Sequence, residues 1–256
     1  MCSVDLKEFV EKYHLNLSQD GTFNPRDIFG SHDDSDHVYN TPRAWYMARC
    51  LNPSTMNWDG PDADFTPLSD DIPWCMVPEK KVTIEDVKYV LSSHFQGTPY
   101  DPYASYGDKS MKGAYRAIGV NRTDFLGIIQ MRPDAGEDSR AIEWVAFASN
   151  VFNTAAPFYT DVEKVPEYFS NTTGDASTDN FYWASRMIAA MADASYSKSI
   201  FHIERYQERV MSKGHEYINQ YDELLAKESN AENAMQLRQE ANQTIADMVK
   251  KKRRIL

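Results

Sequence analysis

Residues 115–150, YRAIGVNRTDFLGIIQMRPDAGEDSRAIEWVAFASN, decide the fold class that we expect for this chain. They contain three apolar runs, at 115–120, 125–131 and 142–148, which polar or proline-containing segments separate. Short apolar runs between such turn residues are typical of antiparallel strands joined by hairpin loops. We therefore predict three adjacent antiparallel strands.

Both faces of the second predicted strand are apolar. Phe125, Ile129 and Met131 fall on one face and Leu126 and Ile128 on the other, because side chains alternate along a strand. A sheet that is apolar on both faces has to be covered on both. The sequence therefore predicts an α+β fold with layers above and below the sheet.

Helix signals precede and follow the predicted strands. Thr83 and Asp86 match a capping box, which predicts a helix that begins at Ile84 and runs to about Phe95. The pattern NPRDIFG predicts a one-turn helix over residues 24–30. Further helices are expected over about 5–13, 41–51, 181–191, 200–227 and 231–251, with an aromatic-rich loop over 157–166.

The last predicted helix is mostly polar and has only a thin apolar stripe. Such a helix projects from the fold or packs against another chain. It leads into the basic run KKKRR at 250–254. We therefore divide the chain into a main domain, residues 1–228, and a helical, basic-ended tail, residues 229–256.

Composition restricts the class of protein. The 256 residues carry a formal net charge of −11 and a pI near 5.0, and an acidic surface argues against nucleic acid or anionic lipid as partner. No apolar stretch approaches the roughly 20 residues of a membrane span, and the N-terminus does not match a signal peptide. Three cysteines, an odd number, fit a reducing compartment, so we predict a cytoplasmic protein.

Possible metal ligands cluster at residues 32–37, HDDSDH. Neighbours in one loop rarely surround an ion without a ligand from elsewhere, so we expect a solvated acidic loop and no metal site. The sequence also lacks a Gly-x-Ser-x-Gly elbow, a Walker loop and a dinucleotide-binding glycine motif. No catalytic motif of these kinds therefore identifies an activity.

Cys2 is a candidate nucleophile of a different kind. Removal of the initiator methionine would make it the first residue, and its own α-amine, with an ordinary pKa of about 7.7 to 8, would then be the general base for its thiol. The next residues, SVDLKE, form the cap and first turn of a predicted helix. A nucleophile of this type opens a strand, and this difference argues against a catalytic Cys2.

Six segments of the chain together resemble one known family. They are LKEFVEKYHLNL, FNPRDIFGS, HVYNTPRAWYMARCLNP, KVTIEDVKYVLSSHFQGTPYDPY, RAIGVNRTDFLGIIQMRP and IEWVAFASNVFNTAAPFY. From about residue 5 to about residue 225, the chain resembles the C-terminal half of the bacterial cysteine dipeptidases of the dipeptidase A type, which are N-terminal nucleophile (Ntn) hydrolases. The resemblance implies an αββα sandwich, hydrolysis of dipeptides without metal or organic cofactor, and a homo-oligomeric full-length enzyme.

The resemblance also implies where the nucleophile lies. In that family a cysteine opens the first strand, far upstream of the helix that residues 5–14 match. Cys2 does not correspond to that position. We therefore expect a fragment that lacks its nucleophilic segment, is inactive alone and has the missing N-terminal half as a possible partner.

Five residues are candidates for substrate contacts in such an enzyme. Arg116 or Arg122 would hold the dipeptide carboxylate in a bidentate pair. Asn121, Asn150 and Asn153, at or just beyond strand ends, would donate to the oxyanion. In the simpler alternative, Asn121 and Arg122 only form a hairpin turn.

Three hypotheses of different classes follow from the sequence. The first is the fragment of a dipeptidase, and the second is a self-sufficient enzyme that uses Cys2. The third is a non-catalytic interaction module held together by its helical tail. An upstream reading frame that encodes the nucleophilic strand would support the first, dipeptide hydrolysis that is lost in Cys2→Ala would support the second, and a stable oligomer without turnover would support the third.

Overall fold

A three-stranded antiparallel sheet occupies the centre of the computed structural model, which describes residues 2–18, 21–31 and 33–253. Its strands are β1 (Phe125–Met131), β2 (Ala141–Phe147) and β3 (Ala156–Tyr159), in the order β1-β2-β3. Phe125 lies opposite Phe147, and a loop with a short 3-10 turn (Glu137–Ser139) joins β1 to β2. The α+β class and two of the predicted strands are confirmed.

The first predicted strand is wrong. Residues 115–120 form no strand; their backbone groups bond elsewhere, since Arg116 N–H donates at 2.9 Å to the carbonyl of Val38, in the short helix Asp36–Tyr39, and Gly119 N–H donates to the Ser93 carbonyl at 2.8 Å. The third strand is instead β3, in a segment that the sequence predicts as a loop because of Pro157. Proline is tolerated there because β3 is an outer strand.

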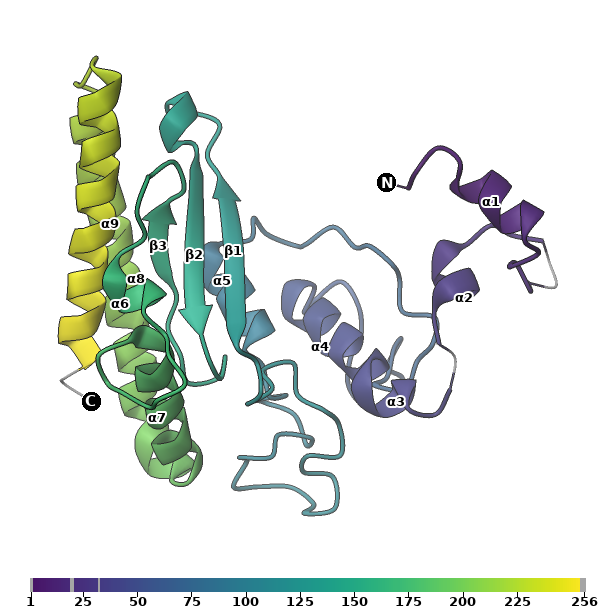
Figure 1. Ribbon diagram of the computed structural model, residues 1–256. Helices are drawn as coiled ribbons and strands as arrows, with labels where there is room; N and C mark the ends of the chain where they lie inside the picture. Colours follow the sequence, from purple (N-terminus) through teal and green to yellow (C-terminus); the bar gives the residue numbers. More distant parts are fainter. Residues whose placement is uncertain (1, 19–20, 32, 254–256) are drawn as a thin grey trace.

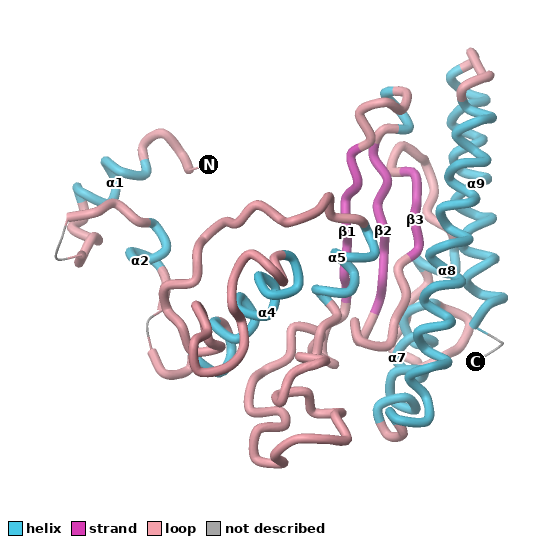
Figure 2. The backbone as a smooth tube through the Cα atoms, turned by 180° about the vertical axis from the view of Figure 1, so that it is seen from behind, coloured by secondary structure: helices cyan, strands magenta, loops and turns pink. Residues whose placement is uncertain are grey.

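Two long helices cover one face of the sheet. α8 (Tyr196–Leu225) and α9 (Ala231–Arg253) lie along β3 in both views of the chain (Figure 1, Figure 2). Trp144 and Ile142 are buried beneath them, and Gly214 of α8 permits close approach, since a Cβ there would lie 2.7 Å from Pro157. This face is the main core of the molecule.

The last helix packs within this chain. Ile245 and Val249 of α9 are fully buried, and Asn242 bonds to both backbone groups of Tyr159 on the outer edge of β3, at 2.9 and 3.0 Å. The prediction that this helix projects is therefore wrong. Residues 226–230, where we place the domain boundary, link α8 to α9, and residues 254–256 lie outside the described part.

The opposite face of the sheet is largely open. Phe125, Ile129 and Met131 are 52%, 70% and 61% exposed. The short helix α6 (Glu167–Ser170) covers only the β3 side, where the rings of Phe158 and Phe169 lie 4.7 Å apart. Cover on both faces was expected, and among the described residues it is missing from the β1 side.

Three predicted helices before the sheet form close to where the sequence places them, and a fourth, at Asp36–Tyr39, forms where the sequence predicts an acidic loop. α1 (Leu6–Lys12), α2 (Pro25–Phe29), α3 (Asp36–Tyr39) and α4 (Thr41–Leu51) lie beyond β1, on the side away from α9 (Figure 1). Asn24 caps α2 by accepting from Arg26 N–H, as predicted. Trp45 and Tyr46 of α4 pack with Phe95 in a second core.

α5 and α7 complete the fold. α5 (Ile84–Leu91) begins with the predicted Thr83–Asp86 capping box but ends before Ser92, earlier than expected. α7 (Phe181–Asp193) begins where predicted, yet Met191 is 72% exposed while alanines of the helix are buried. No helix in the described part of the chain is long and apolar enough to cross a bilayer.

Candidate functional site

The loop between β2 and β3, residues 148–154, is buried and polar. Ala148 has a φ of 65°, a left-handed conformation that a residue with a Cβ rarely adopts, and its N–H donates to the Asp124 carbonyl at 2.9 Å. Asn153 Nδ2 donates to the carbonyls of Phe147 and Ala148 at 2.8 and 2.9 Å. We call residues 148–154 the β2–β3 loop.

Three polar side-chain atoms in this loop are buried without a partner. They are Ser149 Oγ, Asn153 Oδ1 and Thr154 Oγ1, and none has a hydrogen-bond partner among the described residues. Nearly all buried polar atoms are hydrogen-bonded, so three exceptions in one short loop mark it as a candidate site.

A cavity of about 260 Å³ adjoins this loop. Arg116, Asn121 and Ser149 are among the polar residues that line it. Asn150 and Asn153 lie in the loop itself but do not line the cavity, and Arg122 is exposed and does not line it either. The structure therefore brings two of the five candidates together at one cavity and places two more in its supporting loop.

Arg116 has no carboxylate partner within the described ranges. Its guanidinium lies over the Tyr39 ring at 5.6 Å, and its carbonyl accepts from Arg43 Nε at 3.0 Å. Burial and the nearby Arg116 charge together lower the pKa of Arg43. Two half-buried guanidinium groups therefore lie close together, an arrangement that favours an anionic ligand.

Asn121 and Arg122 occupy the turn that leads into β1. Thr123 N–H donates to the Val120 carbonyl at 3.0 Å, which places both residues at the centre of the turn. The Asn121 carbonyl also accepts from Arg186 Nη1 at 2.6 Å. Both residues therefore form the turn that the simpler alternative predicts, and Asn121 also lines the cavity.

A buried histidine network forms another wall of the cavity. His94 Nδ1 lies 2.9 Å from Asp101 Oδ1, and His94 Nε2 lies 3.1 Å from Tyr196 Oη. Tyr103 stacks on Tyr196 with ring centroids 3.9 Å apart, and burial raises the pKa of Tyr196 to about 12. No local sequence pattern reveals this network, because Tyr196 is distant from His94 in the chain.

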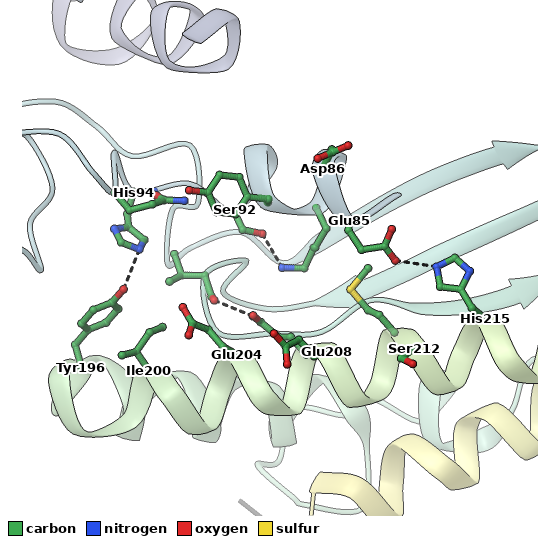
Figure 3. A pocket seen from close by; sticks show the side chains of 16 residues that line it. Glu85, Asp86, Ser92, His94, Tyr196, Ile200, Glu204, Glu208, Ser212 and His215 are labelled. Atoms are coloured by element: carbon green, nitrogen blue, oxygen red, sulfur yellow. Dashed lines mark hydrogen bonds and ion pairs between the residues drawn. The ribbon is translucent and has the colours of Figure 1, made fainter. Parts of the chain in front are cut away.

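A larger groove of about 860 Å³ runs between α5 and α8. His94 and Val151 line both this groove and the small cavity. Figure 3 shows Tyr196, Ile200, Glu204, Glu208, Ser212 and His215 spaced along α8, facing Glu85 and Ser92. Lys88 of α5 lies in this groove, and burial lowers its pKa to about 7. The groove and the small cavity therefore meet at the β2–β3 loop.

The three cysteines lie away from both cavities. Cys2 and Cys75 are exposed, Cys50 is half-buried, and burial raises the pKa of the Cys50 thiol. Cys2 precedes α1, which lies far from the sheet in Figure 1. No cluster of three possible metal ligands occurs in the described residues, and His32 of the acidic loop lies outside them.

Comparison with known proteins identifies the class of this chain. Residues 1–209 match the family model of peptidase family C69, so the chain belongs to that family. It is 55% identical over 229 residues to a dipeptidase of Bifidobacterium longum (strain NCC 2705), covering 89% of this chain and 43% of that protein.

Two further relatives support the same assignment. A probable dipeptidase A of Streptococcus pyogenes serotype M18 (strain MGAS8232) is 46% identical over 231 residues, which are 90% of this chain and 47% of the relative. A probable dipeptidase B of Lactococcus lactis subsp. lactis (strain IL1403) is 34% identical over 251 residues, 96% and 50% of the two chains. The chain thus spans about half the length of the curated relatives that it matches.

Proposed function

We propose that this chain forms part of a cysteine-type dipeptidase with an N-terminal nucleophile. The observation that carries the proposal is its 55% identity, over nearly nine-tenths of its length, to a protein named a dipeptidase. The small cavity agrees with such a substrate, because about 260 Å³ leaves little space for a longer peptide.

Arg116 is the residue that we assign to the substrate carboxylate. It lines the cavity and has no carboxylate partner in the described part of the chain, so a bidentate pair with the free C-terminus of a dipeptide is open to it. Arg122, exposed in the turn, is not needed for this role.

Asn121 is the amide that we assign to the oxyanion. Its side chain has no hydrogen-bond partner among the described residues, and it lines the cavity. Asn153 uses its amide hydrogens on the carbonyls of Phe147 and Ala148, and Asn150 donates to the Leu91 carbonyl at 3.3 Å. For these two asparagines we therefore propose a role in holding the loop.

The proposed chemistry is acyl transfer. A thiolate attacks the scissile carbonyl, the C-terminal amino acid leaves, and water hydrolyses the resulting thioester. Because none of the three cysteines lines either cavity, we propose that the thiol belongs to a segment outside this sequence. The open sheet face at Ile129 and the edge of β1 that no described strand pairs offer a surface on which such a segment would pack.

The experiment that tests this proposal uses two polypeptides. The chain is expressed alone and together with the part of the Bifidobacterium longum relative that it does not match, and the release of free amino acids from dipeptides is measured. We expect thiol-dependent hydrolysis in the pair only. Hydrolysis by the chain alone that disappears in Cys2→Ala would instead support the self-sufficient enzyme.

A further inference from the structure

Lys88 is buried at the junction of the groove and the β2–β3 loop, with 5% of its surface exposed. Its Nζ donates to Ser92 Oγ at 2.6 Å and to the Asn150 carbonyl at 2.7 Å. In the part of the chain that the structure describes, no carboxylate forms an ion pair with it, and burial alone accounts for its lowered pKa. An ammonium buried without a carboxylate is unfavourable, so this position calls for an explanation other than ion pairing.

The hydrogen bonds of the β2–β3 loop show what Lys88 holds. From α5, Lys88 binds the carbonyl of Asn150. From α8, across the groove, Gln207 Nε2 donates to the carbonyls of Val151 and Asn153 at 3.0 and 2.7 Å. Side chains of two helices therefore hold three carbonyls of one short loop.

The other side of this loop forms a wall of the small cavity. Ser149 and Phe152 line the cavity, and the N–H groups of Phe152 and Asn153 both donate to the Ser149 carbonyl, at 3.1 and 3.0 Å. These bonds make residues 149–153 one compact turn. A displacement of the Asn150 carbonyl therefore displaces Ser149 and the cavity wall.

We propose that Lys88 is a positioning residue for the substrate cavity: through the Asn150 carbonyl it fixes the turn at residues 149–153. The claim that the cavity binds substrate rests on the proposed function, whereas the claim that Lys88 fixes the turn does not. The two parts can therefore fail separately.

Hydrogen exchange tests the hold on the turn without any need for activity. Deuterium uptake of peptides spanning 148–154 is followed by mass spectrometry in the wild-type chain, in Lys88→Met and in Lys88→Gln. Methionine keeps most of the side-chain volume but has no donor, whereas glutamine keeps an uncharged donor. Lys112→Met is the matched control, because Lys112 Nζ also donates to a carbonyl, that of Ala104 at 2.6 Å, in a different loop.

We expect Lys88→Met to speed exchange at the amides of residues 151–154 by at least tenfold, while Lys112→Met leaves them unchanged. Should Lys88→Met fail to fold, Lys88→Gln decides, with faster exchange confined to residues 148–154 as the expected result. Wild-type uptake in these peptides, or an increase spread over the whole chain, would overturn the proposal.

Kinetics in the active two-polypeptide enzyme then test the link to the cavity. If the position of residues 149–153 affects substrate binding, Lys88→Met raises KM for dipeptides at least fivefold more than Lys112→Met does. Lys88→Gln, which keeps a donor, should raise KM less than Lys88→Met. Faster exchange with unchanged KM and kcat would leave Lys88 as a structural residue and refute its positioning role. Absence of hydrolysis in the wild-type pair would refute the proposed function but not the exchange result.

Discussion

The buried amine of Lys88 predicts an unusual dependence of stability on pH. Lys88 titrates near its ordinary pKa of 10.5 in the unfolded chain, whereas burial lowers its pKa in the folded chain to about 7. Between these values the unfolded chain binds a proton that the folded chain has released. The free energy of unfolding therefore gains a contribution that rises with pH from about 7 to about 10.5, and below pH 7 the folded state carries the full cost of the buried charge.

The two pKa values set the magnitude of this effect. A difference of 3.5 pKa units corresponds to about 5 kcal/mol, at about 1.4 kcal/mol for each unit. Between pH 7.5 and 9.5 the contribution should rise by about 2 to 3 kcal/mol. Lys88→Met removes this slope. The substitution also leaves the Asn150 carbonyl without its donor, which lowers the free energy of unfolding by about 1 to 3 kcal/mol at every pH.

Urea unfolding measures this difference, with tryptophan fluorescence as the probe at pH 7.5, 8.5 and 9.5. The free energy of unfolding of the wild type relative to Lys88→Met should rise across the three values. The other ionisable groups of the groove occur in both proteins and cancel in the comparison; they are Glu85, Asp86, Tyr89, His94, Tyr196, Glu204, Glu208 and His215. Parallel curves for the two proteins would show that Lys88 is hydrated and would refute the reasoning.

Three further predictions concern the cavity, the sheet edge and the open face. In the active two-polypeptide enzyme, Arg116→Gln should raise KM for dipeptides about 10- to 100-fold, the loss of a charge-assisted pair, whereas Arg122→Gln should change it little. Urea unfolding should show that Asn242→Ala destabilises the chain by about 1 to 3 kcal/mol, because two buried backbone groups of β3 lose their partner. The chain alone should bind a hydrophobic dye, and Ile129→Asp, at a position 70% exposed, should reduce the fluorescence without loss of stability.

Local signals predicted the elements that depend on neighbouring residues. The capping box of Thr83 and Asp86 and the cap of Asn24 are complete within four residues of sequence, so their hydrogen bonds form as expected. Residues 115–120 were misread because an apolar run does not show where its backbone groups will bond. They bond to Val38 and Ser93, which are far away in the sequence.

The candidate site was predictable only in part, for the same reason. Arg116 was a candidate because a guanidinium can pair with a carboxylate, and Asn121 because it follows an apolar run; the structure places both at one cavity. His94 and Lys88 were missed, since each looks like an ordinary helix residue until Tyr196 and the Asn150 carbonyl are brought against it. No local pattern records such distant contacts.

These contacts also change the role of the C-terminal helices. The sequence presents α9 as a polar tail, yet its Asn242 occupies the outer edge of β3 and so closes one side of the sheet. α8 holds the β2–β3 loop through Gln207 and contacts His94 through Tyr196. α8 therefore supports the loop that forms the cavity wall directly, and α9 supports β3, the strand into which that loop leads. The cavity therefore depends on residues that follow it in the sequence, and a chain cut before α8 should lose the cavity wall together with its core.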